Sequence, residues 1–417
     1  MEIIDKIVDI ENIRILQFRP CFRFFFKKLF RKTEKTIYKF QSLCYTEQDK
    51  NWNIQRSVWV NKQNFKPKKQ LFSLAILCVL IVCAFFVLYR VLRFDLPDMM
   101  RIVKTLDVRF LLLAVLCLFG YIFFSGQALS VGAKQFGYRL GFVRATLYAC
   151  NDLYYSAITP SATGGQPAVA YYMSRDGIAV STSTVILLFE TACYMLGLVL
   201  LGVTFLLSHL SMILAAEKWV QILVWLGVFA NVGLSVLCLL AVFWRNAVRK
   251  VAVFLIGLLA RLHLLRNKEK KIENLDMHLE RYASCVEIAK AHPMMLVRMF
   301  LATLAQRVCY IMIAYFVYRS FALPAYENVI EVVGIQLLLA LAVNSLPLPG
   351  GVGISEIVFN WLYLHVYKTE DMMNTAILMT RGINFYLCFL ICGIATFALH
   401  IYQNKKINKE IRSTKVS

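Results

Sequence analysis

Two similar interruptions break an otherwise apolar chain. The first reads Thr159-Pro160-Ser161-Ala162-Thr163-Gly164-Gly165-Gln166-Pro167, and the second reads Leu346-Pro347-Leu348-Pro349-Gly350-Gly351-Val352-Gly353. In hydrocarbon, backbone N–H and C=O groups must be satisfied within the protein, so non-helical backbone is tolerated only where protein or a water-filled cavity shelters it. A matched pair of Gly/Pro-interrupted segments, one in each half of the chain, indicates the binding site of a transporter.

The composition is that of a polytopic α-helical membrane protein. Of the 417 residues, 59% are hydrophobic, and the mean hydropathy is +0.60. The formal charge of +21 comes from basic residues that lie mainly outside the apolar runs, so the positive-inside rule explains it and no nucleic-acid partner is expected. Twelve scattered cysteines without a C-x-x-C motif predict buried free thiols, so we expect no metal, no cofactor and no disulfide framework.

Six apolar runs are long enough to cross a bilayer, which needs about 20 residues. They are Leu71–Leu92, Phe110–Val131, Ile178–Leu207, Trp219–Trp244, Met294–Phe321 and Asp371–Tyr402. We therefore expect a membrane domain over residues 71–402, a basic segment before it (1–70) and a basic tail after it (403–417). Because the first span follows a segment of 70 residues that is basic overall, we expect no cleavable signal peptide. Between Phe18 and Lys39, aromatic and basic residues recur at helical spacing, which is typical either of an interfacial helix on an anionic leaflet or of a basic tail that only fixes orientation.

The distribution of charge predicts the orientation. The N-terminal segment, the 132–144 loop, the 245–292 stretch and the C-terminal tail are all basic, so the positive-inside rule places all four in the cytoplasm, with both termini. The membrane is expected to be the inner membrane of a bacterial cell. The segments 144–177 and 327–371 must then each begin and end on one face.

The arms of these two segments are short. Val143–Ile158, Asn328–Ser345 and Ile354–Tyr367 have 16, 18 and 14 residues, fewer than a full span requires. The economical fold is therefore all-α, with six full spans and two re-entrant helical hairpins that enter from opposite faces as an inverted pseudo-repeat. Charge parity alone does not separate a re-entrant hairpin from a full double crossing.

Five ionisable residues inside apolar segments are candidates for a binding site, because such residues are rare in membranes and face a partner or a cavity. They are Asp152, Glu190, Arg307, Glu356 and Arg381, with Asn151 and Asn344 as polar companions at the two hairpins. A guanidinium offers a planar fork to a phosphate, so we expect the two arginines to line a groove for a phospholipid phosphodiester.

The carboxylates have two interpretations each. Glu190 lies near mid-membrane, where it either forms an ion pair with an arginine of another helix or recognises a cationic lipid headgroup. Glu356 either caps the helix that follows the second interruption or contacts the substrate. Asp152 is interfacial if its hairpin is shallow.

The double glycines permit positive φ and close backbone approach. The helices that follow them would direct free N–H groups towards an anionic phosphate. A tight turn that binds no ligand is the alternative.

The two interruptions also carry a family resemblance. Thr163-Gly164-Gly165-Gln166-Pro167, followed by Tyr171-Tyr172 and Arg175-Asp176-Gly177, resembles one signature of the lysylphosphatidylglycerol synthase transmembrane-region family. The second interruption continues through Ile354-Ser355-Glu356 and, with Arg381 downstream, resembles another. The resemblance covers roughly residues 71–402 and implies a flippase-like membrane domain.

In two-domain relatives a soluble domain transfers lysine or alanine to phosphatidylglycerol, and the membrane part moves the product to the outer leaflet. This chain ends fifteen residues after its last predicted span, so we expect no transferase domain and favour a non-enzymatic function. The resemblance implies translocation of a phospholipid, with aminoacylated phosphatidylglycerol as the leading cargo.

Two alternatives to translocation remain open. One is a membrane subunit of a lipid-modifying enzyme that works with a separate aminoacyltransferase. The other is a regulatory or scaffold protein that binds anionic phospholipids. The sequence leaves the oligomeric state open, with a homodimer as one option.

Overall fold

The computed structural model describes residues 96–159, 162–208, 218–244, 285–323, 329–344 and 369–416, together with residues 214, 249, 250, 253, 358, 359, 362, 363, 366 and 367. The chain divides into two compact units, Met1–Ile76 and Leu77–Ser417, and every described residue belongs to the second. The described ranges are helical and contain no strand. The predicted span Leu71–Leu92, the basic segment 1–70, the second interruption and Glu356 lie outside the described residues.

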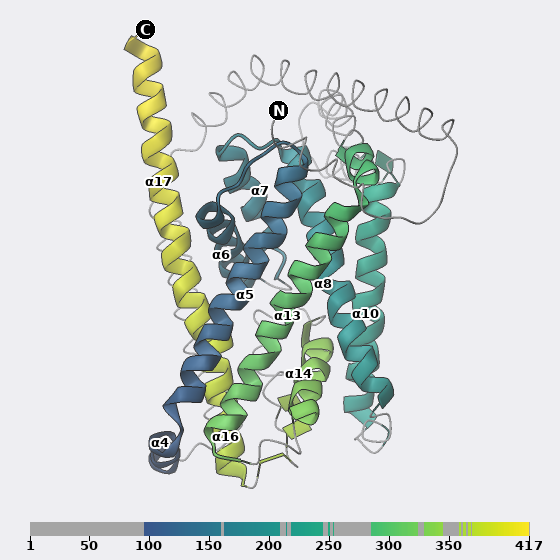
Figure 1. Ribbon diagram of the computed structural model, residues 1–417, viewed down its shortest axis with the longest axis vertical. Coiled ribbons are helices and arrows are strands. Elements are labelled where there is room, and N and C mark those ends of the chain that lie inside the picture. The colour runs from purple at the N-terminus through teal and green to yellow at the C-terminus, as the bar shows by residue number, and fades with distance from the viewer. Residues whose placement is uncertain are drawn as a thin grey trace, which may run out of the picture. The chain divides into compact units, whose positions relative to one another are not determined.

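Five helical stretches are long and apolar enough to cross a membrane. They are α5 (Val108–Gln135), α8 (Val180–Ser208), α10 (Lys218–Phe243), α13 (Pro293–Ser320), and the continuous run of α16 (Glu370–Arg381), the π-helical η3 (Gly382–Leu387) and α17 (Cys388–Val416), all drawn in Figure 1. Each corresponds to one of the six predicted spans. The all-α, multi-pass prediction is thus confirmed for the part of the chain that the structure describes.

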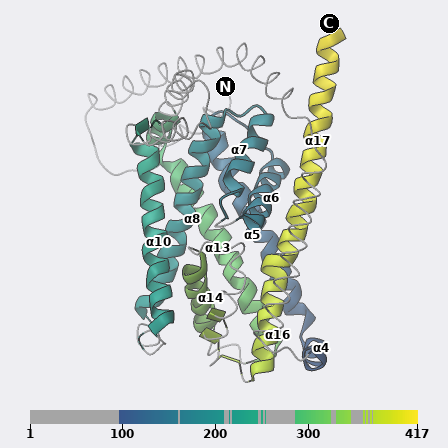
Figure 2. The same ribbon diagram turned by 180° about the vertical axis from the view of Figure 1, so that it is seen from behind.

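Three shorter helices belong to the predicted hairpins. They are α6 (Phe142–Ile158), α7 (Gly165–Arg175) and α14 (Val329–Asn344), and a further helix, α4 (Leu96–Thr105), precedes α5. At 1.5 Å per residue, α6 and α14 are about 25 Å long, which is less than the ~30 Å of a hydrocarbon core. Figures 1 and 2 both show α6 and α7 towards one end of α8 and α14 towards the other.

Specific contacts confirm these two positions along α8. The Gln166 amide at the start of α7 donates to the Thr191 hydroxyl, in the first half of α8. In the second half of α8, Gly202 lies directly against Leu341 of α14, and Gly334 of α14 lies against Phe205. The short helices therefore pack on opposite halves of one spanning helix.

Helix α5 is built to pack closely on several neighbours at once. Its glycines Gly120, Gly126 and Gly132 recur every six residues, so successive glycines point about 240° apart around a helix with 3.6 residues per turn. A Cβ at Gly120 would lie 2.9 Å from the Cys309 Sγ of α13, and one at Gly126 would lie 2.8 Å from the Thr146 backbone nitrogen of α6. At Gly132 it would meet Ile186 of α8. Small residues allow such backbone approach between membrane helices, where van der Waals packing drives association.

The C-terminal helix α17 packs along α6. The ring of Tyr154 stacks on Phe389 with centroids 5.0 Å apart, and the same ring covers Gly393, one turn further along α17. The π-helical turn η3 lies directly before this contact. A π-turn is rare and occurs frequently at functional sites.

The close approach of α5 to α6 gives a test of the packing. Gly126→Ala should lower the free energy of unfolding by about 1–2 kcal/mol, because the added methyl meets backbone that cannot move aside. Gly233→Ala in α10 is the matched control, since a Cβ there would meet no described atom of another helix within 4 Å. The control should be neutral or more stable by up to about 1 kcal/mol, because alanine favours a helix. Equilibrium unfolding in mixed detergent micelles would measure both, and equal stabilities would contradict the close packing.

Candidate functional site

A cluster of charged and phenolic side chains lies inside the helix bundle, about halfway along α5. It is formed by Tyr121 of α5, Asp152 of α6, Glu190 of α8 and Arg307 of α13. Glu190 and Arg307 are 7% and 3% exposed, and Glu190 lies within electrostatic range of both Asp152 and Arg307. Three of the five ionisable residues predicted from the sequence are therefore brought together.

Arg307 is held by aromatic faces. Its guanidinium carbon lies 3.5 Å from the centroid of the Tyr194 ring and 5.6 Å from that of Tyr310. Stacking of this kind stabilises a desolvated cation by about 2 kcal/mol. Nε and Nη2 of Arg307 have no hydrogen-bond partner within the described part of the chain, and no N···O distance of 4.0 Å or less joins Arg307 to a described carboxylate. Two charged donors thus remain available to an acceptor.

Neutral polar groups extend the cluster. The side chain of Asn151 is fully buried, and among the described residues neither of its amide atoms has a hydrogen-bond partner. The rings of Tyr121 and Tyr310 lie with centroids 5.4 Å apart. The Asn384 amide, in the π-helical η3, donates to the Tyr310 hydroxyl over 3.5 Å. We call the following eight residues the central cluster: Tyr121, Asn151, Asp152, Glu190, Tyr194, Arg307, Tyr310 and Asn384.

One hydroxyl, that of Thr159, links the two ends of the first interruption by hydrogen bonds. Thr159 Oγ1 donates to the Tyr155 carbonyl oxygen over 2.8 Å and accepts from the Gly164 N–H over 2.9 Å. The Ala162 N–H donates to the Thr159 carbonyl oxygen over 3.2 Å. The turn from α6 to α7 therefore satisfies much of its own backbone, as a break inside a membrane protein requires.

The double glycine of this turn serves close approach rather than positive φ. Gly164 has a φ of −83°, and the left-handed position is taken by Ala162 at 54°, so Gly164 does not use the positive φ that a glycine permits. A Cβ on Gly164 would overlap Thr159, and one on Gly165 would overlap the Asp152 carboxylate. The side chain nearest the start of α7 is thus a carboxylate of the protein itself, which the positive end of the helix favours.

The remaining predicted residues have different outcomes. Arg381 ends α16, where its guanidinium lies 5.4 Å from the ring centroid of Phe385. Asn384, three residues later, contacts the central cluster through the Tyr310 hydroxyl. Asn344 ends α14, but its side chain lies outside the described residues, as do Glu356, Pro347, Pro349 and the glycines 350, 351 and 353. Their roles stay predictions.

A second polar site joins the first hairpin to the C-terminal helix, and the sequence prediction missed it. The Asp176 carboxylate, 2% exposed, accepts from the Tyr148 hydroxyl over 2.6 Å and from the Gln403 amide over 2.9 Å. Arg144 Nε and Lys406 Nζ lie 3.7 and 3.9 Å from it. This one carboxylate therefore links α6, the end of α7 and α17. In the sequence, Asp176 stood out only as part of the Arg175-Asp176-Gly177 signature, which does not reveal its partners on α6 and α17.

The same junction contains further contacts between α7 and α17. The Gln403 amide also donates to the Tyr172 carbonyl oxygen over 3.0 Å, and the Tyr172 hydroxyl lies 3.3 Å from His400 Nδ1. Arg175 donates to the Asn404 side chain. The two helices are thus held by polar side chains at this end.

Comparison with known proteins gives one match. A family model described as the lysylphosphatidylglycerol synthase TM region matches residues 70–392, which is more than three quarters of the chain. No curated protein matches the chain.

The Asp176 junction can be tested by substitution. Asp176→Ala should lower the free energy of unfolding by about 2–4 kcal/mol, because it leaves buried donors of α6 and α17 without their acceptor. Asp176→Asn keeps one acceptor oxygen for these donors and should lose less. Equilibrium unfolding in mixed micelles would measure the difference, and a wild-type stability for Asp176→Ala would show that the junction does not hold the helices together.

Proposed function

Because the chain belongs to the lysylphosphatidylglycerol synthase TM-region family, we propose that this multi-pass membrane protein moves a phospholipid between the two leaflets of its membrane. An unaided headgroup would have to pass through hydrocarbon, at a cost of several kcal/mol for each unsatisfied polar group. A polar path between helices removes this cost while the acyl chains stay in lipid. The central cluster supplies polar groups at the depth where hydrocarbon would otherwise be.

One observation carries the proposal: Arg307 is buried among spanning helices with two donors unpartnered among the described residues. A guanidinium in this state is suited to a phosphodiester, which accepts two parallel hydrogen bonds. Asn151 adds an unpartnered buried amide. All phospholipids share this phosphodiester, so the arginine would recognise the class rather than one headgroup.

The two carboxylates favour a cationic headgroup within that class. Glu190 lies within electrostatic range of Asp152 and Arg307, and Asp152 also lies within range of Tyr121, so carboxyl groups outnumber guanidinium groups among the described residues of the cluster. An aminoacyl ammonium, as in aminoacylated phosphatidylglycerol, would donate hydrogen bonds to these carboxyl groups. The family description names a synthase of such a lipid, which supports the same cargo.

The family description also favours a second candidate. The chain would then be the membrane subunit of a system in which a separate aminoacyltransferase modifies phosphatidylglycerol. Purified protein that moves lipid by itself would support translocation, whereas lipid modification only in the presence of a transferase would support this alternative.

We further propose that α6–α7 and the segment beginning with α14 are re-entrant hairpins that enter from opposite faces. Their lengths support this, and so do their contacts with opposite halves of α8. In this arrangement both termini face the cytoplasm of a bacterial cell and the hairpins meet near mid-membrane. The movement would be equilibrative or coupled to an ion gradient, because the sequence carries no phosphate-loop motif.

Arg307→Gln should slow lipid movement by about tenfold or more in liposomes, since losing a charged partner for a buried phosphate costs over 1.4 kcal/mol. The assay is dithionite quenching of a headgroup-labelled phospholipid. Arg298→Gln is the matched control, because Arg298 lies on the same helix but is exposed. Unchanged rates in Arg307→Gln would remove this residue from the site, and no movement by the wild type would reject translocation.

Opposite entry of the hairpins predicts opposite accessibility of their turns. In a cysteine-free variant, Thr163→Cys should react with an impermeant maleimide from the cytoplasmic face, and Val352→Cys should react from the other face. Inside-out and right-side-out vesicles separate the two cases. Labelling of both positions from one face would contradict the inverted arrangement.

A further inference from the structure

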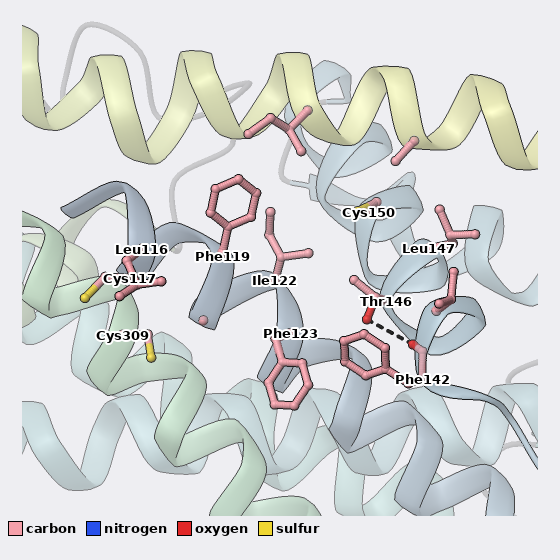
Figure 3. Close-up of a pocket in the computed structure, with 14 residues that line it drawn as sticks. Leu116, Cys117, Phe119, Ile122, Phe123, Phe142, Thr146, Leu147, Cys150 and Cys309 are labelled. Carbon is pink, nitrogen blue, oxygen red and sulfur yellow. Dashed lines mark hydrogen bonds between the residues drawn. The ribbon is translucent and has the colours of Figure 1, made fainter. Parts of the chain in front are cut away.

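An apolar groove runs between α5, α6 and α17 on the outside of the bundle. It has a volume of about 670 Å³, and Figure 3 shows phenylalanine, leucine and isoleucine side chains projecting into it. On α5 it is lined by Leu116, Phe119 and Ile122 among others, and on α6 by Val143, Thr146 and Cys150. Cys309 of α13 and Ile391 and Ala395 of α17 also line it.

The chemistry of the lining excludes a polar occupant. None of its residues is charged, and its one hydroxyl, Thr146 Oγ1, already donates to the Phe142 carbonyl oxygen over 3.0 Å. Leu116, Phe119, Phe142 and Val143 are between 50% and 67% exposed. In a helix that crosses a membrane, such exposed apolar side chains face hydrocarbon. The groove is thus continuous with the lipid-facing surface of α5.

The groove lies directly beside the central cluster. Cys150 forms part of its wall, and the next two residues of α6 are Asn151 and Asp152. On α5, Gly120 and Ile122 line the groove, whereas Tyr121 between them reaches Arg307 and Asp152. The same turns of α5 and α6 therefore carry an apolar surface on the outside and a polar one on the inside.

We propose that this groove holds one acyl chain of the lipid whose headgroup enters the central cluster. The inference rests on the proposed function. The volume lies within the range of about 300–1,000 Å³ that is usual for small-molecule sites. The phosphodiester and its acyl chains are joined through glycerol, so a headgroup at Arg307 requires an apolar surface at the same depth nearby.

The groove would set the position of the acyl chain and would add little to the affinity for the lipid. Hydrocarbon gains little when it moves from lipid to an equally apolar protein surface, because no water is released. Occupancy should therefore depend on the headgroup being bound next to it. A surface that merely touches bulk lipid would show no such dependence.

Photo-crosslinking tests this directly. The wild-type protein is reconstituted with phosphatidylglycerol that carries a diazirine halfway along one acyl chain, and the crosslinked peptides are identified by mass spectrometry. We expect several-fold more crosslinks in α5 and α6 around the groove than at Leu112, an exposed residue of α5 outside it. Arg307→Gln should lower the number of crosslinks around the groove to the number found at Leu112.

The second part of the experiment fills the groove with large side chains. Val143→Trp together with Thr146→Trp should remove the excess crosslinks and slow lipid movement, whereas Leu112→Trp should do neither. Equal crosslinking at the groove and at Leu112, or an excess unaffected by the two tryptophans, would overturn the inference. A groove occupied by another segment of the chain would give no lipid crosslinks there and would also overturn it.

The two proposals can fail separately. Excess crosslinks that depend on Arg307, in a protein that moves no lipid, would keep the acyl-chain site and reject translocation. Lipid movement without excess crosslinks would keep translocation and reject the acyl-chain site.

Discussion

The need to satisfy every backbone polar group inside hydrocarbon governs this structure. It favours helix in the described ranges and, in the re-entrant arrangement proposed above, requires shelter for the turn between α6 and α7. That turn meets the requirement locally, because the Thr159 hydroxyl both donates to α6 and accepts from Gly164. The turn then brings Gly165 against Asp152 and Gln166 against Thr191. The Asp152 carboxylate, a member of the central cluster, thus lies against the start of α7, beside the turn that follows α6.

The second constraint is the cost of a buried charge. Among the described residues, no direct ion pair neutralises Arg307; aromatic rings and the nearby Glu190 side chain stabilise it instead. Such an arrangement tolerates the arginine without occupying its donors. Removing one partner of a buried ion pair leaves an uncompensated charge. An arginine stacked on Tyr194, in contrast, keeps its contact with the ring when a ligand leaves. This difference would suit the proposed lipid site, which a phospholipid would enter and leave in every cycle.

Much of this could be predicted from the sequence, because hydropathy and charge are local properties. The apolar runs indicated the spans, and the rarity of charge within them singled out Asp152, Glu190 and Arg307, which do lie together. What the sequence did not reveal depends on contacts between distant residues. Tyr194 beneath Arg307, Asn384 beside Tyr310 and the Asp176 junction with Gln403 join helices far apart in the chain. The positive φ fell on Ala162 instead of Gly164, because the turn needed its glycine for space rather than for conformation.

The glycines of α5 have a mechanical consequence. At Gly126 helix meets helix at backbone distance, and Gly120 and Gly132 let side chains of α13 and α8 reach the α5 backbone, where repulsion rises steeply and sliding is blocked. Helix α5 therefore fixes the positions of the helices that pack on its glycines, namely α8, α13 and the first turns of α6. The polar contacts of α7 with α17 are instead hydrogen bonds that side chains make to side chains and to the Tyr172 carbonyl oxygen, and each can break without the others. We expect any rocking motion of this protein to pivot on α5 and to be taken up at the junction of α7 and α17.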